Sequence, residues 1–216
     1  MRKKIKIALA DDEILIRQGI KTILLQENEF EVLFDVSNGK ELITTLEENP
    51  QNLPDIILMD INMPEYNGVE ATKYLSKKFP EISIIAVSSY TSETFMKKMI
   101  SVGAVCYIPK NFTPSEMINR IKKVYTNGFC YQPEMVAFIK NNHANKNETP
   151  EISEREKEVL QLICQQKSAS EIAELLSISS RTVDNHRNSL LQKTNSKNVI
   201  GLVVFAIQNH LFLTEK

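Results

Sequence analysis

Polar and charged side chains stand at the ends of four short apolar runs in the first half of the chain. Asp11 and Asp12 follow one run, Asp60 and Ser88 end two others, and Lys110 comes just after a fourth. Three carboxylates that converge repel one another strongly unless a cation neutralises them. Hard oxygen ligands with open positions suit Mg²⁺, which keeps part of its water and shares phosphate oxygens. The pattern therefore predicts a magnesium site that handles phosphate.

The chemistry predicted for this site is phosphoryl transfer to a carboxylate. An aspartate beside a metal ion can attack a phosphoryl group and form an acyl phosphate. A lysine and a hydroxyl nearby, here Lys110 and Ser88, can stabilise charge on the transferred oxygens. A single Asp after a strand is more often a turn former, and Asp11-Asp12 alone could simply start a helix at Glu13. Four separate strand ends with complementary chemistry favour the functional interpretation.

Alternating strand and helix patterns must bring these strand ends together. Five apolar runs are rich in Ile and Val, and most of them show little alternation, as expected of strands buried on both faces. The runs cover residues 5–10, 30–36, 56–60, 82–88 and 104–109. Amphipathic segments separate them, and in the first one Ile16, Ile20, Ile23 and Leu24 form one stripe. The alternation predicts a parallel, doubly wound α/β sheet with its ligand site beyond the carboxyl ends of the strands.

Size, charge and cysteine content exclude several classes of protein. The 216 residues suit one or two domains, and a net charge of -1 means that any basic surface must be local. No apolar run approaches the roughly 20 residues of a membrane span, and the stretch 5–10 is too short for a signal peptide. We therefore expect a soluble, cytoplasmic protein. Cys106, Cys130 and Cys164 stand far apart in apolar runs, which favours small buried side chains over ligands or disulfides.

A set of residues spread over the first 126 positions carries a family resemblance. The set consists of Asp11-Asp12, Met59-Asp60-Ile61-Asn62-Met63-Pro64 followed by Gly68, Ser88, and Tyr107 with Lys110. In these residues and their spacing the segment resembles the receiver domains of two-component response regulators. The resemblance implies a flavodoxin-like (βα)5 fold with a five-stranded parallel sheet. One departure is Asn111, which follows Lys110 where many receivers have Pro.

The same resemblance implies a phosphorylation site and a metal site. Asp60 would be the phospho-acceptor and would receive its phosphoryl group from a sensor histidine kinase. Asp12, Asp60 and the backbone carbonyl of Asn62 would hold Mg²⁺, with Asp11 helping through water. The only reactions of the chain would then be phosphoryl transfer to its own Asp60 and the loss of that group, so we do not expect an enzyme.

The resemblance further implies a switch. Ser88 would receive a phosphoryl oxygen, Lys110 would pair with the phosphoryl group, and Tyr107 would turn inward when Ser88 moves. We expect this rearrangement to alter the surface near the fourth and fifth strands. That surface would either release the C-terminal domain or dimerise, so that DNA affinity rises by linkage.

The pattern changes in the last third of the chain. Residues 141–150 are polar and are typical of an interdomain linker. We expect a receiver domain at 1–126, a linker at 127–150 in which residues 132–140 could form a short helix, and a helical domain at 151–216. Its four helices are expected at 153–166, 169–176, 181–194 and 198–210. Ser153 with Glu156, and Ser168 with Glu171, match the Ser-x-x-Glu capping box.

Residues 171–183 have the pattern of a helix-turn-helix. Ala173 is small enough to let two helices cross closely, Ile178 can fill the turn, and Val183 can pack back against the first helix. Either Ser179 or Ser180 would cap the second helix. The segment therefore predicts a compact DNA-binding motif.

Cations and amides are concentrated along the second helix of this motif. Between residues 181 and 197 four cations stand against one anion, interleaved with Asn, His, Ser and Gln. Such side chains can reach phosphates and base edges. An ordinary solvated helix face competes for any single residue but explains the concentration less well.

Three segments of this region carry a second resemblance. They are Ser153-Glu154-Arg155-Glu156-Lys157-Glu158-Val159-Leu160, Glu171-Ile172-Ala173 and Arg181-Thr182-Val183-Asp184-Asn185-His186. They resemble the LuxR-type helix-turn-helix, so the whole chain is similar to NarL/FixJ-type response regulators. The resemblance implies that double-stranded DNA is contacted by Arg181, Thr182, Asp184, Asn185, Arg187, Asn188 and Lys193. Asp184, Asn185 and Asn188 would face the major groove, and the three cations would bind phosphates.

The C-terminal segment departs from the family pattern at three positions. Gln166 stands where the family usually has Gly, Val199 stands where an Arg is common, and Asp184 replaces a frequent Lys. Asp184 could accept a hydrogen bond from cytosine or could weaken binding, and the sequence leaves both open.

The last predicted helix bears two apolar stripes. One consists of Ile200, Val203, Val204 and Ile207, and the other of Leu202 and Phe205. One stripe can pack the domain core, and an exposed second stripe would favour a homodimer on paired half-sites. A helix buried on both sides is the competing interpretation.

Two other functions compete with a phosphorylation-controlled transcriptional regulator. A Mg-dependent aspartyl-phosphate phosphatase-like enzyme also uses a strand-end Asp, but its pattern Asp-x-Asp has Asn62 in the second place here. A phosphorylation-independent DNA-binding regulator is the other alternative, and the complete set of receiver residues argues against it.

Overall fold

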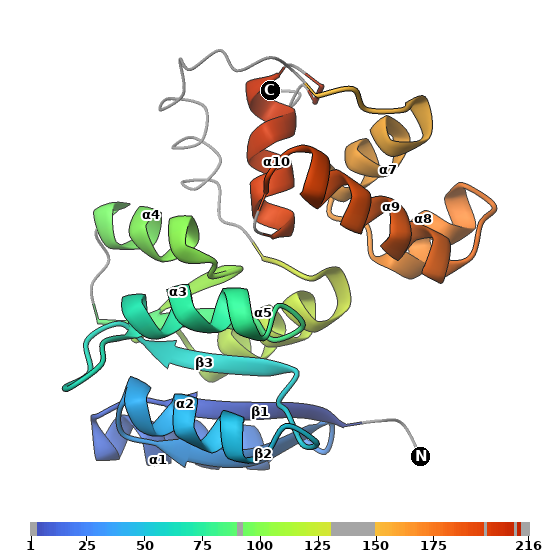
Figure 1. Cartoon of the computed structure of the whole chain (residues 1–216). Helices are drawn as coiled ribbons and strands as arrows, with labels where there is room; N and C mark the ends of the chain where they lie inside the picture. Colours follow the sequence, from blue (N-terminus) through green and yellow to red (C-terminus); the bar gives the residue numbers. More distant parts are fainter. Residues whose placement is uncertain (1–3, 90–92, 131–149, 197, 210, 213–216) are drawn as a thin grey trace. The chain divides into compact units, whose positions relative to one another are not determined.

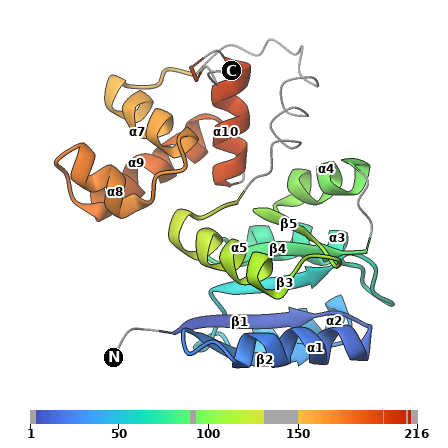
Figure 2. The same cartoon turned by 180° about the vertical axis from the view of Figure 1, so that it is seen from behind.

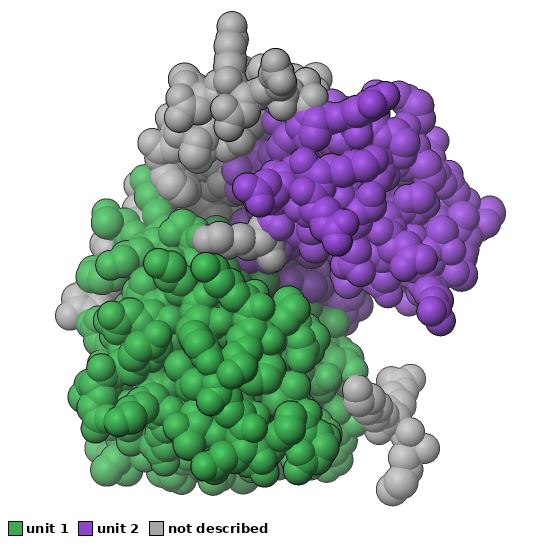
Figure 3. All heavy atoms as spheres, viewed as in Figure 1, with its two compact units in different colours: residues 1–125 green, residues 126–216 purple. Residues whose placement is uncertain are grey.

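The computed structural model of the chain describes residues 4–89, 93–130, 150–196, 198–209 and 211–212 (Figure 1). The chain divides into two compact units, Met1–Tyr125 and Thr126–Lys216 (Figure 3). The short helix predicted at 132–140 and most of the predicted linker lie outside the described residues. The domain boundaries predicted at 126 and 150 stay predictions.

A five-stranded parallel sheet forms the centre of the first unit. Its strands are β1 (Ile5–Ala10), β2 (Phe30–Val36), β3 (Ile56–Asp60), β4 (Ser83–Ser88) and β5 (Cys106–Pro109). Their order in the sheet is β2-β1-β3-β4-β5, and every neighbouring pair is parallel. The direction of winding therefore reverses between β1 and β3, and a ligand site is expected beyond their carboxyl ends. The predicted parallel, doubly wound fold is confirmed.

Helices cover both faces of this sheet. They are α1 (Ile14–Leu25), α2 (Gly39–Glu48), α3 (Gly68–Lys78), α4 (Glu93–Val102) and α5 (Pro114–Asn127). Figure 1 shows α2 and α3 on one face, and Figure 2 shows α1 and α5 on the other. Because the sheet is covered twice, every residue of β3 is buried, as the absence of alternation in the sequence predicted. The stripe predicted on the first helix faces the core through Ile20 and Leu24, which are buried.

The start of α3 lies directly against the end of β3. Asn67 and Glu70 close a capping box that fixes the first turn of α3. A Cβ atom added to Gly68 would lie 1.9 Å from the backbone oxygen of Asp60. Only glycine allows this approach, so Gly68 helps to place the end of the strand that carries Asp60.

The second unit contains four described helices, α7 (Glu154–Cys164), α8 (Ala169–Leu175), α9 (Ser180–Lys193) and α10 (Val199–Gln208). Both predicted capping boxes are present, at Ser153 and at Ser168. Ser179 caps α9 by accepting a hydrogen bond from the backbone N–H of Thr182. The four predicted helices are confirmed with small shifts at their ends.

The helix-turn-helix consists of α8, a short turn and α9. Ala173 and Val183 are buried where the two helices meet, and Ile178 is half-buried in the turn. The backbone N–H of Ile178 donates to the Ala173 carbonyl at 2.9 Å, which closes the end of α8. Ser177 in the turn has a positive φ of 52°. The packing predicted for this motif from Ala173, Ile178 and Val183 is present.

The burial of α10 decides between the two interpretations of its stripes. Ile200 and Val203 are buried, but Leu202 of the second stripe is also completely buried and Phe205 is half-buried. The helix packs against both α7 and α9. The second stripe is therefore not an exposed surface, and the interpretation of a helix buried on both sides holds.

Two further expectations concern buried cysteines and membrane spans. Cys106, Cys130 and Cys164 are buried and form no disulfide, as predicted. None of the helices that the structure describes combines the length and apolar character needed to cross a membrane.

Candidate functional site

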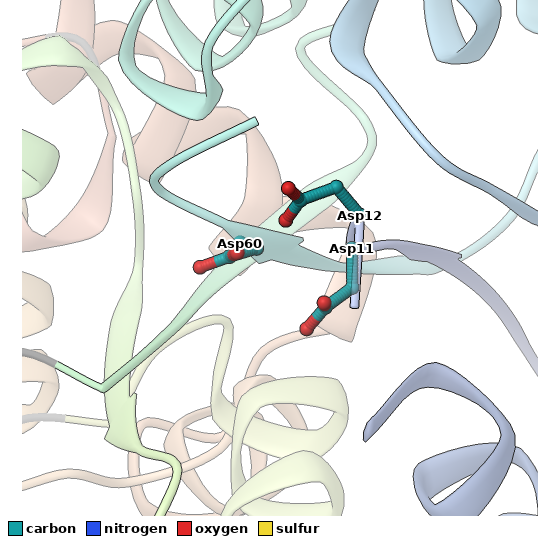
Figure 4. Close-up of side chains that lie close together, drawn as sticks. All are labelled: Asp11, Asp12 and Asp60. Atoms are coloured by element: carbon teal, nitrogen blue, oxygen red, sulfur yellow. The ribbon is translucent and has the colours of Figure 1, made fainter. Parts of the chain in front are cut away.

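Three carboxylates converge at the carboxyl ends of β1 and β3 (Figure 4). We call Asp11, Asp12 and Asp60 the acidic triad. One oxygen from each carboxylate lies within 4.8 Å of the others. These residues come together because Ala10 and Met59 are paired across the two strands. Asp11 and Asp60 are buried and Asp12 is exposed, so the triad opens to solvent on the side of Asp12.

Lys110 supplies a buried positive charge beside the triad. Its Nζ atom lies 2.8 Å from Asp11, 2.6 Å from Glu13 and 3.3 Å from Asp60. Its backbone N–H donates to the Ser88 carbonyl at 2.7 Å, which places the residue at the end of β4. Burial lowers the pKa of Lys110, but hydrogen bonds to Asp11 and Glu13 and the charge of Asp60 raise that pKa above its usual value overall. The side chain is therefore a permanent cation.

Asp60 is ionised at a cost in free energy. Burial raises its pKa, the charge of Lys110 opposes this, and the charge of Asp11 adds to it, so that the pKa lies at about 6. Its Oδ1 atom accepts a hydrogen bond from the backbone N–H of Ile61 at 2.7 Å. A divalent cation would favour the ionised form, and three carboxylates provide the hard oxygen ligands that such a cation requires. The acidic triad thus fits a metal ion.

Asp11 is held at each of its polar groups. Its backbone N–H donates to the Val36 carbonyl at 3.1 Å, and its Oδ1 accepts from the Glu13 backbone N–H at 2.8 Å. Its Oδ2 pairs with Lys110, and its carbonyl accepts a hydrogen bond from the Arg17 guanidinium. The sequence reasoning missed Glu13 and Arg17. The sequence could have indicated both residues, since they stand within one or two turns of Asp12 at the start of the first predicted helix.

Ser88 and Tyr107 lie on neighbouring strands beside Asp60. Both are almost completely buried. Burial raises the pKa of Tyr107, a hydrogen bond with Ser88 lowers it, and the charge of Asp60 raises it, with a net increase. Tyr107 thus points into the protein beside Ser88. Asn62, whose carbonyl was predicted as a ligand, is exposed two residues beyond Asp60.

The predicted DNA contacts lie along α9 and differ in their surroundings. Arg181, Asn185 and Asn188 are exposed, and Thr182 is half-buried at the N-terminal cap. The half-buried Asp184 lies 3.0 Å from Arg187 on the same helix, so these two charges pair with each other.

Lys193, at the end of α9, is paired with Glu156 of α7 at 2.7 Å. Glu156 is buried and also accepts hydrogen bonds from the Ser189 hydroxyl at 2.7 Å and the Ser153 backbone N–H at 2.8 Å. Burial raises the pKa of Glu156, but Lys193, Ser189 and Ser153 together lower that pKa to about 2. The sequence predicted only the capping role of Glu156. The one sign of its contacts with Ser189 and Lys193 was that these two residues stand one helical turn apart.

Two family models match the chain, one for each unit. Residues 7–122 match the response regulator receiver domain, and residues 150–206 match the bacterial regulatory proteins of the luxR family. The chain belongs to the NarL/FixJ family of response regulators.

Relatives of this response regulator match it over nearly its whole length. It is 34% identical to the transcriptional regulatory protein DegU of Brevibacillus brevis, over 95% of this chain and 94% of DegU. It is 31% identical to the response regulator protein VraR of Staphylococcus epidermidis, over 96% of this chain and 98% of VraR. A structure of the response regulator RcsB in a complex with DNA covers 94% of this chain and 98% of RcsB, with a TM-score of 0.57 and 22% identity, and shows a common fold.

Family membership establishes the general role of this response regulator. It is a two-component response regulator with a LuxR-type DNA-binding helix-turn-helix, and the acidic triad is consistent with a phosphorylation site. Its family consists of transcription regulators and not of enzymes, which overturns the alternative of a phosphatase-like enzyme.

Proposed function

We propose that this response regulator accepts a phosphoryl group on Asp60 from a sensor histidine kinase and then binds its operator more tightly. One observation carries the proposal: a buried carboxylate stands at a strand end between two other carboxylates and a buried lysine. In the reaction an ionised oxygen of Asp60 forms the new bond to phosphorus while the phosphorus–nitrogen bond of the donor breaks. Lys110 favours this reaction because it stabilises the ionised form of Asp60.

The acidic triad would hold Mg²⁺, with the Asn62 carbonyl as a further ligand and Asp11 acting through water. When bound, Mg²⁺ supplies positive charge that offsets the negative charge of the triad and of the phosphoryl oxygens. The residues of the chain orient the reaction. The buried ends of β1 and β3 exclude bulk water from one side of Asp60, and the exposed Asp12 leaves the other side open to the donor.

Lys110 and Ser88 would contact the phosphoryl oxygens once Asp60 is modified. Lys110 already lies within 3.3 Å of Asp60, so it needs only to exchange its partner Glu13 for a phosphoryl oxygen. Ser88 would donate its hydroxyl to a second oxygen and leave Tyr107, which lies beside it in the buried position. This exchange would alter the surface around β4 and β5 and bias the receiver towards its active state.

DNA recognition would use the exposed face of α9 in the major groove. Arg181, Asn185 and Asn188 are exposed, so we expect them to contact the operator directly. Thr182, Asp184 and Arg187 lie on the same helix, and Arg187 would have to leave Asp184 to bind a phosphate. Lys193 would contact a phosphate while it shares its charge with Glu156.

The active form would be a homodimer on two half-sites about one helical turn apart. Because α10 is largely buried, its second stripe does not support the dimer, and the receiver surface near β4 and β5 is the better candidate. The cytoplasmic location expected from the sequence stays a prediction.

Selection of binding sites from a random duplex-DNA pool tests the proposal. The full chain is incubated with and without a small-molecule phosphodonor and Mg²⁺, alongside Asp60→Asn and the control Glu31→Gln, which removes an exposed acid from β2. We expect a dyad motif to be enriched with phosphodonor by the wild type and the control, but not by Asp60→Asn. Equal enrichment without phosphodonor would indicate a phosphorylation-independent regulator. No enrichment in any sample would refute control of DNA binding.

A further inference from the structure

Arg17 of α1 connects three segments around the acidic triad. Its Nε atom donates to Asp35 of β2 at 3.1 Å, and its Nη1 atom donates to the carbonyl of Asp11 at the end of β1. The side chain is only 12% exposed, and it lines a small cavity together with Asp11 and Asp60. The guanidinium therefore lies beside the triad, where it contacts the backbone of Asp11 and not a carboxylate of the triad.

The carbonyl that Arg17 holds belongs to the peptide unit between Asp11 and Asp12. A peptide unit is planar, so an interaction that fixes its oxygen also fixes the Cα atom of the next residue. The backbone N–H of Asp11 is fixed separately by the Val36 carbonyl. Rotation of this peptide would swing the carboxylate of Asp12 away from Asp11 and Asp60. The hydrogen bond from Arg17 therefore helps to fix the positions of both Asp11 and Asp12.

Arg17 is itself anchored firmly. Asp35 receives a second cation, Lys21, at 2.5 Å, and a weaker hydrogen bond from Gln18 at 3.4 Å. The hydrogen bond from Lys21 lowers the pKa of Asp35, burial opposes this, and Arg17 lowers it further, so Asp35 stays ionised. A planar guanidinium can bind two acceptors in a fixed geometry, which a lysine ammonium cannot do.

Lys110, which also restrains Asp11, takes part in the reaction itself. When Lys110 binds a phosphoryl oxygen, it exchanges Glu13 for that oxygen. The contact from Arg17 to the backbone is unaffected by this exchange, because it comes from α1 and not from the end of β5. Arg17 can thus keep the end of β1 in place before and after phosphorylation.

We propose that Arg17 is a positioning residue that sets the affinity of the acidic triad for its divalent cation by holding the Asp11–Asp12 peptide. The proposal rests on the metal site proposed above. Groups that orient metal ligands from behind typically change metal affinity by about 10- to 100-fold when they are removed. Arg17 acts on the ligands and not on the phosphoryl group, so its loss changes the metal requirement and leaves the maximal rate of phosphorylation unchanged.

Lys21 offers a matched control. It binds the same carboxylate as Arg17, from the next turn of the same helix, and carries the same charge. Arg17 donates two hydrogen bonds, to Asp35 and to the Asp11 carbonyl, and we call this pair the fork. Lys21→Gln removes a partner of Asp35 and leaves the fork in place. Arg17→Gln removes the fork itself.

Two measurements on the full chain separate the possibilities. Electron paramagnetic resonance of free Mn²⁺ gives the affinity of the unphosphorylated protein, and the initial rate of phosphorylation by acetyl phosphate is measured against Mg²⁺ concentration. For Arg17→Gln we expect the Mn²⁺ dissociation constant and the half-saturating Mg²⁺ concentration to rise about tenfold, with an unchanged rate at saturating Mg²⁺. Lys21→Gln is expected to behave like the wild type in both measurements.

Several results would overturn the proposal. Unchanged Mn²⁺ affinity in Arg17→Gln would do so, and so would an equal loss in Lys21→Gln, which would point to general electrostatics. If Arg17→Gln does not fold, Arg17→Lys keeps the charge and loses the fork, and wild-type affinity in that variant would refute the role. A wild type that binds Mn²⁺ but takes no phosphoryl group would refute the proposed function alone. A wild type that binds no Mn²⁺ would refute both.

Discussion

Replacing Glu156 with Gln should loosen the packing of α9 on α7. The buried carboxylate of Glu156 pairs with Lys193 at 2.7 Å and accepts a hydrogen bond from Ser189 at 2.7 Å. A glutamine has the same shape and can keep the hydrogen bond from Ser189, but it has no charge to offer Lys193. The change therefore removes the electrostatic part of the interaction and little else.

The magnitude follows from the pKa of Glu156. A carboxyl whose pKa lies at about 2 instead of 4.5 stabilises the folded state by about 3 kcal/mol when it is ionised. The Lys193 side chain is 39% exposed, so solvent screening reduces the expected loss in Glu156→Gln to about 1–2 kcal/mol. Because the pKa is lowered on folding, this stability is present above pH 4.5 and is lost as the pH falls from about 4.5 to about 2.

Hydrogen exchange of the α9 amides in the full chain measures this effect. At pH 7 we expect exchange in Glu156→Gln to be about 5- to 30-fold faster than in the wild type, which corresponds to about 1–2 kcal/mol. At pH 3, after correction for intrinsic exchange, the difference should fall below half in free energy. The control is Glu158→Gln, which removes an exposed acid of the same helix that pairs with Arg155. Equal exchange in the two variants at pH 7, or an undiminished difference at pH 3, would refute the reasoning.

Three other changes have definite expected outcomes. Asp60→Asn should raise the unfolding free energy of the metal-free protein by about 1–3 kcal/mol at pH 7. The reason is the raised pKa of Asp60, about 6, which means that the ionised side chain destabilises the fold above pH 3.8. Urea unfolding without Mg²⁺ measures this, and the difference in unfolding free energy between variant and wild type should vanish at pH 3. Gly68→Ala should destabilise the receiver by about 1–3 kcal/mol and slow phosphorylation, because its methyl group would overlap the Asp60 carbonyl, and a wild-type midpoint in urea would contradict this. Gln166→Gly should stabilise the C-terminal unit by about 1 kcal/mol, since Gln166 has a φ of 60°, and calorimetry showing no gain would count against it.

Much of the receiver could be predicted from local patterns. The Ile and Val runs predicted five strands, and β1, β2 and β3 have the predicted bounds. Most runs lacked alternation, which predicted burial on both faces, but the edge strand β2 is largely half-buried. The polar residues at the strand ends predicted the meeting of Asp11, Asp12 and Asp60, because parallel strands place their carboxyl ends at one edge. Capping boxes at Ser153 and Ser168 predicted two helix starts, since a cap depends only on residues three positions apart.

Interactions between distant segments required the tertiary structure. The fork of Arg17 depends on how far α1 is rotated over β2, and periodicity says which stripe is buried but not where a long polar side chain ends. Glu156 has a visible capping role, yet its pairing with Lys193 exists only because α7 and α9 cross. Likewise, an apolar stripe on α10 cannot show how many neighbours cover it.

The departures from the family pattern show the same division. The sequence, set beside the family pattern, showed that Gln166 stands where a glycine is usual and Asp184 where a lysine is frequent. Only the structure decided what these changes mean: Gln166 occupies a left-handed backbone conformation, and Asp184 pairs with Arg187. The reason is physical. Residue type and spacing specify local hydrogen bonds and the burial of one face, whereas backbone conformation at a turn and the partner of a charged side chain are set by the packing of whole elements.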